Sequence, residues 1–252
     1  MWLTHLVRRT ISQSYALPLH TTGLDFSRMA FGVAARKIKL FFGLYDPLTR
    51  LAAKNRSDKG VTVFPFNGYS VHYAKLFERF RDRPINILEI GLARRTDRHS
   101  LGGSCPSLNM WLDYFPRAKV YGFDIDDFSG VALSRTRIFR GDQGNAEDLL
   151  NVVAECPRFD IIIDDGSHAS YHQQLTLKIL FPYLASNGLY VIEDLYWQPE
   201  DLEASLPPVW KTRDLLKNKS VLNQTICKAK EILFFDSPIK GSRGSVAVIV
   251  KE

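Results

Sequence analysis

Two short apolar runs, each ending in acidic residues, constrain the fold of this chain more than any other feature. The first run is Phe159–His168, FDIIIDDGSH, and the second is Gly188–Asp194, GLYVIED. Apolar, β-branched runs of this length are typical of buried strands in a parallel sheet that is covered on both faces. A stretch of helical length, 171–184, separates them. The sequence therefore predicts a strand–helix–strand unit with carboxylates at both strand exits.

The acidic residues at these two exits predict a site for a divalent cation. In open parallel sheets, ligands bind in the crevice beyond the carboxyl ends of the strands. Three or four carboxylates that converge there repel one another unless a cation joins them, and hard divalent cations prefer oxygen ligands. We therefore expect a metal site at this edge of the sheet.

Strand and helix patterns alternate along most of the chain. Expected strands cover 85–91, 119–124, 136–142, 161–163, 189–192, 231–235 and 245–251, expected helices cover 72–81, 106–115, 146–154 and 171–184, and an acidic, Pro-containing loop covers 199–208. This alternation predicts an α/β fold with a doubly wound, mostly parallel, Rossmann-like sheet. Gly241 and Gly244 separate the last two strands, which predicts a C-terminal β-hairpin.

The distribution of charge divides the chain into two regions. Residues 1–56 carry nine Lys and Arg against two Asp, whereas residues 57–252 carry 24 basic and 25 acidic residues. Within the first region, Arg36–Phe42 has the pattern of a basic amphipathic helix. We expect a basic helical leader over 1–56 and one domain over 57–252. The leader would serve as a lid, as an oligomer contact or as an attachment to a membrane surface.

Composition also excludes several classes of protein. The near-neutral main region lacks the basic surface of a nucleic-acid-binding protein, so we expect no nucleic-acid partner. No apolar run approaches the roughly 20 residues that span a bilayer, and the N-terminus lacks the order of a secretory signal. Three widely spaced cysteines, Cys105, Cys156 and Cys227, form neither a disulfide framework nor a zinc-ligand pattern. We expect a cytoplasmic protein, with peripheral membrane contact through the leader as an alternative.

Polar residues at the ends of the first three strands suit an adenosine-containing cofactor. Gly91 ends the first strand, where a glycine lets the backbone approach a ligand closely. Asp124 ends the second strand, and an acid in this place accepts hydrogen bonds from both ribose hydroxyls of a nucleoside. Asp142 and Gln143 follow the third strand, where their side chains are candidates for contact with an adenine edge.

The turn after the first strand discriminates between classes of cofactor. Its sequence, GLAR at 91–94, lacks the G-x-G-x-x-G pattern of a dinucleotide site, and the chain has no P-loop pattern. S-adenosylmethionine carries no phosphate and needs no such cradle, so the set of polar strand ends favours this cofactor. A NAD(P)-dependent oxidoreductase and a non-catalytic cofactor-binding protein are the alternatives.

Longer segments carry a resemblance to a known family. They are NILEIG (86–91), GGS (102–104), PSLNMWLDYFP (106–116), VYGFDI (120–125), GDQ (141–143), DDGSH (164–168) and VIEDL (191–195). With these segments the chain resembles class I S-adenosylmethionine-dependent methyltransferases. More narrowly, it resembles the metal-dependent sugar O-methyltransferases of macrolide and aminocoumarin biosynthesis and the related cephalosporin-hydroxylase-like group. The combination of DDGSH with the later IEDL is its most specific part.

The resemblance implies an activity and a set of metal ligands. The activity is transfer of a methyl group from S-adenosylmethionine to a hydroxyl of a sugar or glycosylated metabolite, with a catechol-like or lipid hydroxyl as the alternative acceptor. The implied ligands of Mg²⁺ are Asp165, Glu193 and Asp194, with Asp164 as an alternative to Asp165. His168 is implied as the base that removes the proton of the acceptor hydroxyl.

The resemblance also implies where the cofactor binds, near Glu89 and Gly91 for its methionine part and on Asp124 for its ribose. A second arrangement stays open, in which His168 and His172 form an i, i+4 metal pair on a helix. The chain departs from the family in a basic insertion, Arg94–Leu101, and in its leader. The acceptor and the oligomeric state, including a homo-oligomer, are therefore left open.

Overall fold

A seven-stranded sheet forms the centre of the molecule. The computed structural model describes residues 32–40, 43–63, 65–92, 105–218, 220, 222 and 226–252. The strand order is β3-β2-β1-β4-β5-β7-β6. The strands are β1 (Asn86–Ile90), β2 (Lys119–Asp124), β3 (Thr136–Arg140), β4 (Phe159–Asp164), β5 (Leu184–Ile192), β6 (Ala229–Asp236) and β7 (Ser245–Lys251). Strands β1 to β5 pair in parallel, and β7 is antiparallel to both β5 and β6. The predicted doubly wound sheet and C-terminal hairpin are confirmed.

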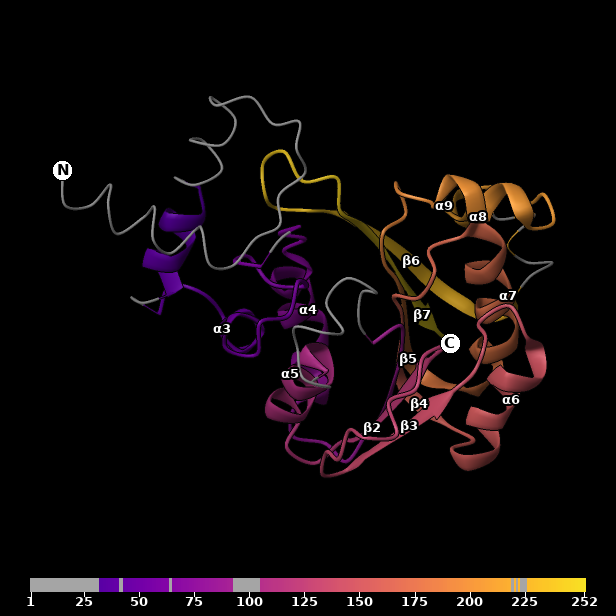
Figure 1. Cartoon of the computed structure of the whole chain (residues 1–252), viewed down its shortest axis with the longest axis horizontal. Coiled ribbons are helices and arrows are strands. Elements are labelled where there is room, and N and C mark those ends of the chain that lie inside the picture. Colours follow the sequence, from indigo (N-terminus) through magenta and orange to yellow (C-terminus); the bar gives the residue numbers. More distant parts are fainter. Residues whose placement is uncertain are drawn as a thin grey trace.

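Helices cover both faces of the sheet (Figure 1). On one face lie α3 (Pro47–Lys54), α4 (Tyr69–Phe77) and α5 (Pro106–Tyr114), and on the other lie α6 (Ala146–Glu155), α7 (Ser170–Leu180), α8 (Glu200–Ser205) and α9 (Thr212–Lys217). Short 3₁₀ turns, Glu78–Phe80 and Phe181–Tyr183, follow α4 and α7. Residues 32–40 are also helical. None of the helices in the described part of the chain has both the length and the hydropathy of a bilayer-spanning segment.

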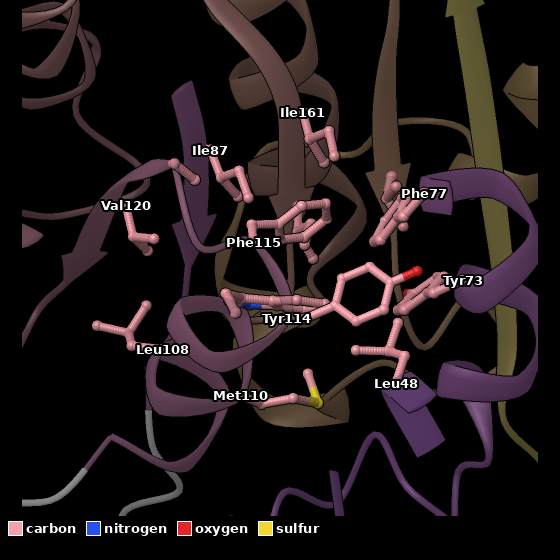
Figure 2. Packing of buried hydrophobic residues seen from close by; sticks show 14 of the residues in the cluster. Leu48, Tyr73, Phe77, Ile87, Leu108, Met110, Tyr114, Phe115, Val120 and Ile161 are labelled. Carbon is pink, nitrogen blue, oxygen red and sulfur yellow. The ribbon is translucent and has the colours of Figure 1, made fainter. Parts of the chain in front are cut away.

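Two hydrophobic clusters, one on each face, hold these layers together. Ile87 belongs to the cluster under α3, α4 and α5, whereas its neighbours Leu88 and Ile90 belong to the cluster under α6 and α7. This division follows from the alternation of side chains along a strand. Figure 2 shows the first cluster, in which Phe77 of α4 and Phe115 after α5 pack over Ile87 and its neighbours.

Helix α3 adds to the first cluster although it lies within the predicted leader. Asp46 caps the helix by accepting a hydrogen bond from the Thr49 amide at 2.8 Å, and Pro47 occupies its first turn. Leu48 and Ala52 are fully buried in the cluster. The predicted boundary after residue 56 therefore assigns α3 to the leader, although α3 packs on the domain. Residues 1–31 and 41–42 of the leader lie outside the described residues, and so does the basic insertion 94–101.

Candidate metal and cofactor site

The exits of β4 and β5 lie side by side at one edge of the sheet. Parallel pairing places Asp164 opposite Ile192, and the Glu193 amide donates to the Asp164 carbonyl at 2.9 Å just beyond the strands. The next residues bring together three side chains that can bind a metal, those of Asp165, His168 and Asp194. One ligand atom from each lies within 4.8 Å of the other two. Of the acidic residues at these two exits, Asp165 and Asp194 come together, with the imidazole of His168 beside them.

The backbone turns sharply at two of these three residues. His168 has φ 62° and Asp194 has φ 55°, a left-handed conformation that residues with a Cβ adopt at some cost in free energy. The hydroxyl of Tyr69 donates to Oδ1 of Asp194, and the Trp197 amide donates to the Asp194 carbonyl at 3.1 Å. These bonds hold the Asp194 carboxylate toward Asp165 and His168. Nε2 of His168 is 3.7 Å from Oδ2 of Asp194.

Behind this group lies a buried lysine that binds three carboxylates. The Lys59 side chain is 1% exposed, and its Nζ is 3.0 Å from Oε1 of Glu193 and 3.3 Å from Oε1 of Glu89. It also forms an ion pair with Asp165. Tyr73 donates its hydroxyl to Oε1 of Glu193 at 2.8 Å. Glu193 therefore has buried partners and lies outside the group formed by Asp165, His168 and Asp194.

The cluster around Lys59 contains more carboxyl groups than ammonium groups, a composition that suits a bound cation. Burial alone would lower the pKa of Lys59, but the carboxylates around it raise that pKa well above its ordinary value, so the ammonium stays protonated. Burial and the nearby Asp165 raise the pKa of Glu193 well above its ordinary value. Lys59 carries one positive charge, and its ion pairs do not include Asp194. A divalent cation between Asp165 and Asp194 would reduce the repulsion between these two carboxylates.

Asp164 points to the other face of the sheet and away from this group. Its Oδ1 accepts a hydrogen bond from Nε2 of Gln143 at 2.8 Å, and burial raises its pKa to about 6. His172 is also directed elsewhere, since its Nδ1 lies 2.8 Å from Oγ of Ser167. Among the described residues, the metal-capable group contains neither Asp164 nor His172.

The turn after β1 lies directly against the exit of β4. Gly91 has φ 83°, and a Cβ placed there would lie 2.1 Å from the carbonyl oxygen of Asp165. Only glycine fits this close approach of two backbones. Glu89, two residues earlier, is fully buried and accepts a hydrogen bond from Nε1 of Trp111 at 3.1 Å. The expected contact point for the methionine part of a cofactor therefore adjoins the metal-capable group.

The other expected cofactor residues differ in burial and in how many of their polar atoms already form hydrogen bonds within the protein. Asp124 is buried and accepts hydrogen bonds from the amides of Leu92 at 2.8 Å and Asp126 at 2.9 Å, so its carboxylate is fixed beside the Gly91 turn. Asp142 is exposed and accepts a hydrogen bond from the Gly144 amide.

Gln143, by contrast, uses its amide group within the protein. It donates to Asp164 and Thr176 and accepts from the Ser167 amide. These bonds tie the third strand's exit to the loop after β4, a structural role that the sequence pattern did not indicate.

Sequence reasoning missed the residues that support the acidic cluster, Lys59, Tyr69 and Tyr73. Lys59 lies in a polar stretch that resembles a domain boundary, and its partners Asp165 and Glu193 are more than 100 positions away. Tyr69 and Tyr73 are four residues apart on α4, a spacing that equally suits an ordinary buried helix face. The signal available in the sequence was the position of Lys59 shortly before two tyrosines that lie on one helix face.

Comparison with known proteins places these residues in context. No protein-family model matches the sequence. The mycinamicin VI 2''-O-methyltransferase of Micromonospora griseorubida is 41% identical over 132 residues, which are 51% of this chain and 32% of the relative. The L-olivosyl-oleandolide 3-O-methyltransferase of Streptomyces antibioticus is 40% identical over 154 residues, which are 60% of this chain and 38% of the relative. The matched regions therefore span about a third of each relative's length.

Solved structures agree with the sequence relatives. The MycE methyltransferase of the mycinamycin pathway, in complex with Mg and SAH, matches with a TM-score of 0.63 and 28% identity, over 82% of this chain and 55% of that chain. A complex of MycE with Mg, SAH and mycinamycin VI matches with a TM-score of 0.62 and 29% identity. The resemblance and the fold class are thus confirmed: the chain has the Rossmann-like methyltransferase fold and is similar in sequence to O-methyltransferases that act on glycosylated natural products.

Proposed function

We propose that this chain is a metal-dependent O-methyltransferase that moves a methyl group from S-adenosylmethionine to a hydroxyl of a sugar in a glycoside. The observation that supports it most is the group of Asp165, His168 and Asp194 beside the Gly91 turn. A site for a hard cation, an imidazole and a cofactor turn meet there at one edge of the sheet. A passive binding protein has no use for this combination, and the turn at 91–94 lacks the glycine pattern of a NAD(P)-dependent oxidoreductase.

Asp165 and Asp194 are the proposed ligands that the structure brings close together, and Glu193 is the third. Glu193 reaches a cation at Asp165 if its carboxylate moves away from Lys59, which it now contacts. Bound Mg²⁺ would hold the acceptor hydroxyl and lower its proton affinity, and bound S-adenosylmethionine would supply the methyl group. The carboxylate oxygens of Asp165 and Asp194 are the ligand type that a hard divalent cation prefers.

His168 is the proposed base. Its ring contacts both Asp194 and Trp197, and its side chain is 15% exposed. Nε2 would take the proton of the acceptor hydroxyl while the oxygen forms its bond to the methyl carbon. S-adenosylmethionine, when bound, would release the methyl group and keep the electron pair of its carbon–sulfur bond as a neutral thioether. Placing the acceptor in line with that bond supplies a large share of the rate enhancement.

Glu89, Gly91 and Asp124 are the proposed cofactor residues, with Asp142 and Gln143 toward the adenine. Glu89 is directed into the cluster, where it contacts Lys59 and Trp111, and it is the proposed contact for the methionine part of the cofactor. Gly91 keeps the turn free of a side chain, and Asp124 presents a fixed carboxylate to the ribose. The adenine contact of Gln143 requires that its amide exchange one of its internal hydrogen bonds.

The relatives support the acceptor class. Their names describe methylation of mycinamicin VI at the 2'' oxygen and of L-olivosyl-oleandolide at the 3 oxygen, and a MycE structure contains Mg, SAH and mycinamycin VI. We infer a sugar hydroxyl as the acceptor here.

We also infer a cytoplasmic location, in which Cys105, Cys156 and Cys227 remain free thiols. The leader's proposed roles as lid, homo-oligomer contact or membrane-surface attachment belong to the same proposal.

A product screen tests this function. The full chain is incubated with methyl-labelled S-adenosylmethionine, Mg²⁺ and a panel of deoxysugar glycosides, catechols and lipids, with and without EDTA. The proposal predicts labelled glycosides that disappear with EDTA and return when Mg²⁺ is restored in excess. Labelling of only a catechol or lipid would refute the sugar acceptor, and transfer that is insensitive to EDTA would refute the metal.

A further inference from the structure

Two large aromatic side chains are exposed immediately after Asp194. Tyr196 is 53% exposed and Trp197 is 56% exposed, although Leu195 before them is buried. Exposed aromatic groups at the rim of a crevice are a common feature of ligand-binding sites, because they offer apolar area together with a polar atom. Their position beside a proposed metal ligand suggests contact with the acceptor.

Trp197 forms one wall beside the proposed base. Its ring meets the His168 ring edge to face, with centroids 5.4 Å apart and planes inclined by 71°. The hydrogen bond from its amide to the Asp194 carbonyl fixes the turn that carries it. The free area of the indole therefore flanks the position from which a hydroxyl would give its proton to His168.

Tyr196 lies on the other side of the same turn and is held by an arginine. The guanidinium carbon of Arg213 is 4.0 Å from the centre of the Tyr196 ring. Arg213 is fixed in turn by a 2.6 Å hydrogen bond to Oγ of Ser245 and by an ion pair of 3.7 Å with Asp236. The phenol ring is thus oriented before any ligand arrives, which reduces the entropy that binding costs.

An open hollow of about 460 Å³ adjoins Tyr196. Its other lining residues come from the tip of the β6–β7 hairpin and are Asp236, Ser242, Arg243 and Gly244. The hollow is connected to Asp194 through the protein, because a Cβ at Gly244 would lie 2.8 Å from the hydroxyl oxygen of the buried Tyr69, and that hydroxyl donates to Asp194. Its volume lies within the roughly 300–1,000 Å³ that is usual for small-molecule sites.

We infer that this aromatic turn and hollow form the acceptor-binding site, in which Trp197 packs against the reacting sugar and the hollow beside Tyr196 takes the rest of a neutral glycoside. The inference rests on the proposed function and adds the residues that choose its substrate. A sugar has C–H faces that pack on aromatic rings and hydroxyl edges that bond to carboxylate, guanidinium and hydroxyl groups. Among the residues that line the hollow, Asp236 and Ser242 offer hydrogen-bond acceptors and Arg243 offers donors, which suits the hydroxyl groups of a glycoside.

Binding of two simple glycosides tests the inference. Methyl and phenyl α-L-rhamnopyranoside are titrated into the full chain loaded with Mg²⁺ and SAH, and dissociation constants are measured by ligand-observed NMR. Trp197→Ala should weaken both glycosides by roughly two- to tenfold, and Trp197→Phe should restore part of the loss. Tyr196→Ala should mainly remove the extra affinity that the phenyl group gives. These effects concern binding, so they do not depend on proton transfer by His168.

Trp210 provides a matched control, because it is 53% exposed but lies outside the turn that carries Tyr196 and Trp197 beside His168. Trp210→Ala should bind both glycosides as the wild-type protein does, and circular dichroism checks that every variant folds. Equal affinities in the Trp197→Ala and Trp210→Ala variants would overturn the inference, and so would a wild-type protein that binds neither glycoside. SAH affinity is measured separately by calorimetry. A wild-type chain that does not bind SAH would refute the proposed function itself, and this inference with it.

Discussion

At the scale of single residues, one ammonium group organises carboxylates from three separate parts of the chain. Lys59 contacts Glu89 from β1, Asp165 after β4 and Glu193 after β5. The acids could be predicted because they end apolar strands, and parallel strands present their carboxyl ends at one edge. Lys59 could not, because no periodic pattern links it to partners that are distant in sequence.

Replacing Lys59 tests how far the fold depends on this ion-pair cluster. Lys59→Met removes the charge while keeping much of the side chain's volume, and it leaves Glu193 buried beside Asp165 without a cation. We expect a loss of about 3–5 kcal/mol in the free energy of unfolding, measured by denaturant titration, as for other buried pairs that lose one partner. Lys75→Met on exposed α4 surface is the control, with a change within about 0.5 kcal/mol. Equal stabilities of the two variants would contradict the proposed role of Lys59.

His168 belongs to the same scale, because its role depends on one nitrogen. His168→Ala should lower the rate of methyl transfer by roughly 10²- to 10⁴-fold, the usual contribution of a general base. The affinity for SAH should stay near the wild-type value, since His168 contacts Asp194 and Trp197 rather than the Gly91 turn. Rapid-quench kinetics and calorimetry separate the two quantities. A variant with an unchanged rate would exclude His168 from the chemistry.

At the scale of elements, the buried strands could be predicted from the sequence, whereas a short exposed helix and the exact end of a longer helix could not. The strand β2 was predicted over its observed range, because its burial leaves a nearly continuous apolar run. The predicted loop at 199–208 instead contains α8, whose six residues include none that is buried and therefore leave no apolar periodicity. The predicted helix 171–184 ends in a 3₁₀ turn that contains Pro182, which lacks the amide hydrogen that a longer helix needs.

The close contact between the turn after β1 and the exit of β4 can be tested by a single substitution. Gly91→Ala places a Cβ against the Asp165 carbonyl and forces the two backbones apart. We expect weaker binding of both SAH and Mg²⁺, because the cofactor turn and a metal ligand move together. Gly241→Ala is a matched control, since Gly241 has φ 86° but nothing within 4 Å of an added Cβ. It shares the conformational cost of about 1–3 kcal/mol without the collision. Similar affinities in the two variants would show that the contact does not shape the site.

At the scale of the whole molecule, the sheet order brings the cofactor turn and the metal ligands to one edge. β1 lies between β2 and β4, so the Gly91 turn is flanked by the Asp124 exit on one side and the Asp165 exit on the other. The alternation of strands and helices predicted a doubly wound sheet, whereas the order of its strands became known only from the structure. The residues that line the hollow beside Tyr196 were not predictable, because they come from the β5 exit and from a hairpin tip about 40 positions later.

Binding of a metal should stabilise the whole fold, because it neutralises carboxylates that are confined near one another. Mg²⁺ at about 100 times its dissociation constant should add about 2.7 kcal/mol to the free energy of unfolding of the wild-type chain. Asp165→Asn should lose most of this gain while the fold is kept, as measured by thermal unfolding with and without EDTA. An equal gain in both proteins would mean that Mg²⁺ binds elsewhere.

The location of the cation is the most direct test of the account. Crystals grown with Mn²⁺ and SAH allow the metal to be placed by its anomalous scattering. We predict a peak about 2.0–2.3 Å from carboxylate oxygens of Asp165 and Asp194, with SAH bound against the Gly91 turn and its sulfur facing the crevice of His168. Well-ordered SAH with no anomalous peak at these carboxylates, or a peak at another part of the surface alone, would contradict it.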